Sequence, residues 1–185
     1  MNEFFAYVSQ FGHLTPPQQD IVAQHATRLT LRKGDYFAAH QVGFVEAGML
    51  RICSYTEQGD ELTQYFIEEG QLLLDIRKVE CADTPSACLV QALTDCQFVV
   101  FTTRQWHAFA HLIPNWETIV QKMIAQAMRA KLERVQPLVA QNAAARYTSF
   151  LTMYPQLANR VPLAYLASYL GMTQSSLSRI RKNIR

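Results

Sequence analysis

The chain has 185 residues, of which 49% are hydrophobic and 17% are charged, and its formal net charge is +2. This length suits one large or two small domains with a real hydrophobic core. The sequence has no run of about 18 apolar residues, which excludes a conventional transmembrane helix, and its first residues lack a positive leader and a cleavage site, so we expect a cytoplasmic protein.

Residues 3–28 predict helical structure in two segments. Pro16-Pro17 restarts the chain between them, because proline is well suited to the first turn of a helix. Apolar side chains recur at helical spacing in both segments. They are Phe4, Phe5, Val8, Phe11 and Leu14 in the first, and Ile21, Val22 and Ala26 in the second.

From Leu29 to about Thr103 the pattern changes to short β-rich segments. These are Thr30–Arg32, Leu50–Tyr55, Thr63–Ile67, Cys88–Leu93 and Gln97–Phe101. Gly48, Gly59 and Gly70 fall 11 residues apart at the corners between segments. Regular short strands with a glycine at each corner predict an antiparallel roll or barrel.

A long helix is predicted next. A helical pattern starts near Trp106, Pro114 restarts it at Asn115, and Pro137 is expected to stop it after Gln136. One face alternates in steps of four and three residues, as paired helices do. Its members are Trp116, Val120, Met123, Ala127 and Ala130. We expect homodimerisation through this seam; packing of the same face on the roll is the alternative.

The stretch from Leu163 to Arg185 predicts two helices joined by a tight turn. Gly171 can adopt the left-handed conformation that ends a helix, and the Thr173 hydroxyl can cap the next one. The apolar positions are Leu163, Leu166, Ala167 and Leu170, then Leu177, Ile180 and Ile184. This pattern is typical of a helix-turn-helix that enters a DNA groove. An ordinary helical hairpin with a solvated outer face is the alternative.

The outer face of the second of these helices carries hydrogen-bonding and cationic side chains suited to base edges and phosphates. The candidate DNA-binding residues are Gln174, Ser175, Ser178, Arg179, Arg181, Lys182 and Arg185. The 48 residues from Leu138 to Arg185 include six basic residues and no Asp or Glu, so this tail carries +6 and the rest of the chain −4. Such asymmetry indicates a polyanionic partner. A membrane surface is disfavoured, because a lipid-binding helix needs a large apolar face.

The order of roll, long helix and C-terminal three-helix unit resembles the Crp/Fnr family of bacterial transcription regulators. The most specific segments are Arg146-Tyr147, Tyr154-Pro155, Arg160-Val161-Pro162-Leu163, the run from Leu166 to Thr173, and the run from Leu177 to Lys182. The resemblance implies an α+β fold with a cyclic nucleotide-binding-like sensor domain at 1–113, a dimerisation helix at 114–137 and a DNA-binding domain at 138–185. It implies that Gln174, Ser175, Ser178 and Arg179 contact bases, with Arg179 on guanine, while Arg181, Lys182 and Arg185 hold phosphates.

The partners implied are double-stranded DNA, a second copy of the chain, RNA polymerase and a small-molecule effector. The positions that match the family's effector pocket are Gly70, Gln71, Leu72, Pro85, Ser86 and Ala87. The family's ribose-binding glutamate is replaced by Gln71 and its phosphate-binding arginine by Pro85. A buried phosphate without a paired cation is costly, so we expect that cyclic AMP is not the natural effector, although Arg77 and Lys78 lie near enough in sequence to substitute.

Other functional classes have weaker support. The four cysteines, Cys53, Cys81, Cys88 and Cys96, lack the clustering of an iron–sulfur or zinc site, so small buried side chains are expected, with Cys81 and Cys88 as residual redox candidates. His107 and His111 share a helical face, but no third metal ligand accompanies them, and nothing favours a haem ligand among the histidines. No nucleophile or phosphate-loop motif indicates an enzyme. The alternative function is a ligand-binding signalling module whose basic tail binds a protein.

Overall fold

The computed structural model describes residues 1–38, 40–74 and 88–184. These residues form seven helices and seven strands in a mixed α+β fold with antiparallel sheets, as expected. The helices are α1 (Asn2–Ser9), α2 (Pro16–His25), α4 (Thr103–Leu112), α5 (Trp116–Ala140), α6 (Ala143–Met153), α7 (Leu163–Tyr169) and α8 (Gln174–Ile184). The strands are β1 (Thr27–Leu31), β2 (Gln41–Ala47), β3 (Leu50–Tyr55), β4 (Glu61–Ile67), β5 (Leu72–Leu73), β6 (Leu89–Ala92) and β7 (Cys96–Thr102).

The described chain divides into two compact units. The first comprises Met1–Ile52 with Phe66–Gln126, and the second comprises Cys53–Tyr65 with Ala127–Arg185. The second unit therefore combines the end of the β3–β4 hairpin with the C-terminal half of α5 and helices α6, α7 and α8. The division into domains at residues 113 and 137 stays a prediction.

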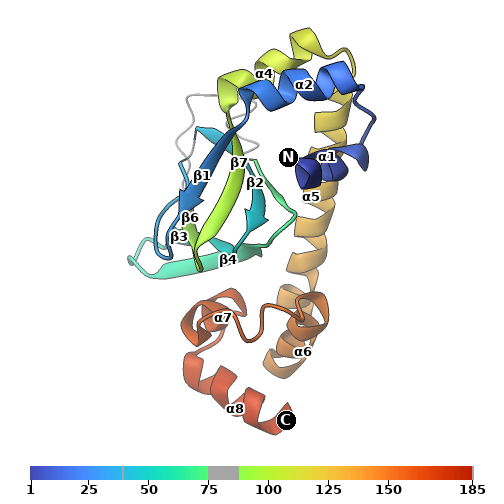
Figure 1. Cartoon of the computed structure of the whole chain (residues 1–185). Coiled ribbons are helices and arrows are strands. Elements are labelled where there is room, and N and C mark those ends of the chain that lie inside the picture. The colour runs from blue at the N-terminus through green and yellow to red at the C-terminus, as the bar shows by residue number, and fades with distance from the viewer. Residues whose placement is uncertain (39, 75–87, 185) are drawn as a thin grey trace. The chain divides into compact units, whose positions relative to one another are not determined.

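The strands form two sheets. One has four strands in the order β1–β7–β2–β5, and the other has three in the order β4–β3–β6. Figure 1 shows β1, β7 and β2 side by side, and their register places Gly43 of β2 opposite both Val100 of β7 and Leu73 of β5. The glycines at the predicted corners, together with Gly34, have positive φ, so the chain reverses where the sequence indicates.

An aromatic core fixes the first unit. Trp106 and Phe109 of α4 pack on Trp116 at the start of α5, with ring centroids 4.9 and 5.1 Å from it, and the Trp116 Nε1 donates to the Trp106 carbonyl at 3.0 Å. Phe4 of α1 and Phe101 of β7 continue the same cluster, with ring centroids 5.4 Å apart. The core thus joins the N-terminal helices, the four-stranded sheet and the first turns of α5.

Two boundaries differ from the predictions. The second N-terminal helix ends at His25, and residues from Thr27 belong to β1, because the chain there pairs with β7. Helix α5 continues through Pro137 to Ala140. A proline in the last turn removes one intrahelical hydrogen bond, while its own carbonyl still accepts from the Gln141 N–H at 3.2 Å, so the helix ends one turn later than expected.

None of the helices in the described ranges combines the length and the apolar character needed to cross a bilayer.

The tight turn at Gly48 yields a stability prediction. A Cβ there would lie 2.7 Å from the Cys96 Sγ and would also meet the Asp95 carbonyl, and φ is +96°. We expect Gly48→Ala to lower the free energy of unfolding by about 3 kcal/mol. Gly59→Ala is the matched control, because φ is +87° but nothing lies within 4 Å of the added Cβ. Gly59→Ala should lower the free energy of unfolding by about 1 kcal/mol. Both values can be measured by urea unfolding followed by circular dichroism. Equal losses would contradict the close-contact explanation.

Candidate nucleic-acid interface

The turn between α7 and α8 is built by backbone hydrogen bonds. The Met172 N–H donates to the Ala167 carbonyl at 3.0 Å, and the Gly171 N–H donates to the Ser168 carbonyl at 3.1 Å. This is the paired pattern that ends a helix on a left-handed residue, and Gly171 has the required φ of +61°. The predicted role of Gly171 is therefore confirmed.

Helix α8 begins with a side-chain cap. The Thr173 Oγ1 accepts from the Ser176 N–H at 3.2 Å, which confirms the predicted cap. Behind the turn, Leu166, Leu170 and Leu177 are fully buried, and the small side chain of Ala167 is buried with them. Helices α7 and α8 therefore pack through these four of the predicted apolar positions, whereas Ile184 at the end of α8 is 45% exposed, and the two helices lie in succession near the C-terminus (Figure 1).

The packing turns the polar face of α8 outward. Gln174, Ser175, Arg179 and Lys182 are exposed, and Ser178 is half-buried. Arg179 has no hydrogen bond or ion pair within residues 1–38, 40–74 and 88–184, so its guanidinium is available to a partner. The outward residues offer two long cationic side chains, one amide and short hydroxyls, which suit phosphates and base edges.

One of the predicted phosphate contacts, Arg181, is not fully exposed. Arg181 is half-buried, and its Nη2 lies 3.5 Å from both the Ala158 carbonyl and the Asn159 Oδ1, so it leans on the loop between α6 and α7. Arg185 lies outside the described residues. Among the predicted phosphate contacts, Lys182 is thus the exposed one that the structure describes.

The candidate effector pocket is described only in its first part. Gly70 lies in a turn and has a φ of +79°, and β5 begins two residues later at Leu72. The Gln71 Oε1 accepts from the Glu68 N–H at 3.3 Å, so this side chain folds back on its own turn. Pro85, Ser86 and Ala87, together with Arg77, Lys78 and Cys81, lie outside the described residues.

The predicted dimer seam is wrong for three of its five residues. Trp116, Val120 and Met123 are buried in the core of the first unit, because this face packs within the chain, as the alternative expectation had it. Ala127 is exposed and Ala130 is half-buried.

A different apolar stripe on α5, which we did not predict from the sequence, is exposed. Met128, Leu132, Val135 and Val139 are 50%, 72%, 45% and 81% exposed. They follow one another in steps of four, three and four residues, which is the spacing of a coiled-coil seam. This spacing could have predicted the stripe from the sequence, but the first seam has a similar spacing and larger aromatic and β-branched residues.

The cysteines and histidines form no site in the described residues. Cys53 and Cys96 are buried and Cys88 is half-buried, and burial raises the pKa of the Cys96 thiol. His107 and His111 are exposed on α4. Within the described ranges, no group of three His, Cys, Asp or Glu side chains could hold a metal ion.

Comparison with solved structures identifies the fold. FixK2 from Bradyrhizobium japonicum matches with a TM-score of 0.73 and 19% identity over 86% of this chain and 84% of that chain. The c-di-GMP responsive global regulator CLP from Xanthomonas campestris matches with a TM-score of 0.71 and 14% identity over 92% and 91%. A chain from Eubacterium rectale described as a transcriptional regulator of the Crp/Fnr family matches with a TM-score of 0.72 and 14% identity over 92% of this chain and 83% of that chain.

These likenesses show that the chain has the fold of Crp/Fnr regulators. At such low identity they establish the fold alone. The sequence matches no protein-family model and no curated protein.

The cap of α8 can be tested by mutation. Thr173→Ala removes the acceptor of the Ser176 N–H, and we expect it to destabilise the helix by about 1 kcal/mol. Hydrogen exchange at the Ser176 amide should accelerate by about fivefold, since exchange follows the local opening free energy. Thr173→Ser keeps the oxygen and is the matched control. Unchanged exchange in Thr173→Ala, or equal acceleration in both variants, would contradict the capping role.

Proposed function

We propose that this protein is a homodimeric, cytoplasmic, sequence-specific DNA-binding transcription regulator rather than an enzyme. The observation that carries the proposal is the exposed polar and cationic face of α8, placed by a glycine turn and a threonine cap after α7. The tail's charge of +6 supports a polyanionic partner, and the Crp/Fnr fold supports a regulator.

In this proposal α8 is the recognition helix, which lies in the major groove. Arg179 contacts guanine through a bidentate pair, and Gln174, Ser175 and Ser178 contact neighbouring bases. Lys182 and Arg185 bind phosphates, and Arg181 helps to hold the helix against the preceding loop. RNA polymerase is a further partner expected of a regulator of this kind.

We assign dimerisation to the exposed stripe of α5, which replaces the predicted seam. A second copy of the chain is the occupant that fits, because residues spaced by four, three and four on one helix are complementary to themselves in a parallel pair. A dimer would present two recognition helices to successive major grooves, one helical turn apart.

In this proposal the sensor roll does not use cyclic AMP as its effector in the way that nucleotide-binding members of the family do. Gln71 stands where the family has an acid and is bonded within its own turn. An effector or partner that favours one arrangement of α5 would shift the population of DNA-binding molecules, provided that it binds the two states with different affinity.

The role of Arg179 can be tested by duplex binding. Arg179→Ala should cost about 1–3 kcal/mol on the preferred site and relax its base choice, because a bidentate base contact is lost. Lys182→Ala is the control for a phosphate contact. It should weaken every sequence alike and reduce the salt slope by about one. An equal loss on all sequences for Arg179→Ala would contradict its role in base recognition, and salt-insensitive association would favour a protein partner.

The dimer interface can be tested by sedimentation equilibrium. Leu132→Glu should raise the dissociation constant of the dimer by about a hundredfold, since two buried leucine side chains are lost per dimer. Leu112→Glu is the matched control, because Leu112 is 49% exposed on α4, outside the stripe. An intact dimer in Leu132→Glu, or equal dissociation in both variants, would place the interface elsewhere.

A further inference from the structure

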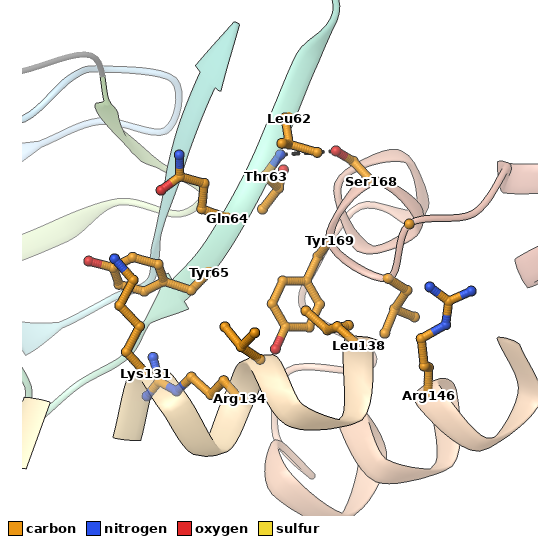
Figure 2. Close-up of a pocket in the computed structure, with 13 residues that line it drawn as sticks. Leu62, Thr63, Gln64, Tyr65, Lys131, Arg134, Leu138, Arg146, Ser168 and Tyr169 are labelled. Atoms are coloured by element: carbon orange, nitrogen blue, oxygen red, sulfur yellow. Dashed lines mark hydrogen bonds between the residues drawn. The ribbon is translucent and has the colours of Figure 1, made fainter. Parts of the chain in front are cut away.

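A pocket of about 410 Å³ lies inside the second unit. Figure 2 shows how it is lined by 13 residues from β4, α5, α6 and the end of α7. Its size falls in the range of small-molecule sites. The β4 side is fixed to α7 by Ser168, whose Oγ accepts from the Thr63 N–H at 2.9 Å and donates to the Glu61 carbonyl at 3.3 Å.

The charge of the lining is one-sided. Lys131, Arg134 and Arg146 line the pocket, and none of the 13 lining residues is acidic. Over the described ranges, no carboxylate forms an ion pair with any of these three cations. Lys131 and Arg134 both lie within 6 Å of the Tyr65 ring centroid and have no counter-charge there, so they repel each other, and an anion beside them would relieve that repulsion.

One donor in the lining lacks a partner. The Arg146 Nε is buried and has no hydrogen bond within the described structure. A buried unsatisfied donor is costly in a folded protein and is rare unless a ligand or solvent satisfies it. Gly171 leaves the space beside this guanidinium open, because a Cβ there would lie 3.2 Å from the Arg146 Nη1.

Aromatic and aliphatic side chains form the remaining walls. The Lys131 Nζ lies 5.9 Å and the Arg134 Cζ 5.8 Å from the centroid of the Tyr65 ring, and Figure 2 shows the Lys131 side chain extending toward that ring. Burial raises the pKa of Tyr169, and the charge of Arg134 acts in the opposite direction, which is consistent with their proximity. The apolar walls are completed by Leu62, Val135, Leu138 and Leu170.

We propose that this pocket binds a small organic anion with a planar apolar body. Its carboxylate or phosphate group would be held by Arg134 and Lys131 beside the Tyr65 ring, and its body would lie against Tyr65 and Tyr169, with the Arg146 Nε at the opposite end of the pocket (Figure 2). The site does not include the Gly70–Gln71 turn and needs no DNA. A failure of the DNA-binding proposal would therefore leave the proposal of this anion site intact.

Isothermal titration calorimetry of the full chain tests the proposal with three probes. Benzoate and phenyl phosphate carry the two candidate head groups on the same ring, and benzyl alcohol is the neutral analogue. We expect saturable binding of at least one anion, stronger than that of benzyl alcohol by about tenfold or more. The stronger anion identifies the head group. Absence of saturable binding by both anions, or equal affinity for benzyl alcohol, would overturn the proposal.

Three variants test the assigned residues. Arg134→Gln should weaken binding of the preferred anion by about tenfold, and Arg146→Gln, at the other end of the pocket, should weaken it by a smaller factor. Lys131 is exposed, so Lys131→Gln keeps the test valid if either arginine variant fails to fold. Arg179→Gln on α8 is the matched control, since it removes the same charge outside the pocket. Unchanged affinity in all folded pocket variants, or an equal loss in Arg179→Gln, would overturn the proposal.

Discussion

The packing of α7 against α8 is the constraint on which the functional surface depends. Gly171 ends one helix in a left-handed conformation and Thr173 caps the next, so the turn between them has a single defined course. Leu166 and Leu177 then occupy the space between the helices. Since the apolar face of α8 is used there, its polar face must lie outward. The cationic surface is thus a consequence of local turn chemistry and of burial.

The sequence predicted the features that depend on local chemistry. The strand Leu50–Tyr55 has its expected bounds, the corner glycines have positive φ, the second helix starts at Pro16, and Thr173 caps α8 as predicted. The face that α5 buries was not predictable in this way. That helix carries two apolar stripes, and only the tertiary packing of Trp116 on Trp106 shows which one belongs to the chain's own core.

The pocket of the second unit was equally hidden from the sequence, because its lining comes from segments about 100 residues apart. Thr63 and Ser168 meet through a hydrogen bond that no local pattern encodes. Arg146 belongs to one of the segments that resemble the family, and its Nε is buried beside the turn between α7 and α8. An anion there would contact the end of α7, so ligand binding and the placement of α8 would share the same residues.

Selection of bound duplexes from a random pool by the full chain would show directly whether the outward face of α8 discriminates bases. We expect enrichment of a palindromic site whose half-sites are centred about 10 base pairs apart, as two recognition helices of a symmetric dimer require. A bound pool indistinguishable in sequence from the input would contradict it, because the outward face of α8 would then discriminate no bases.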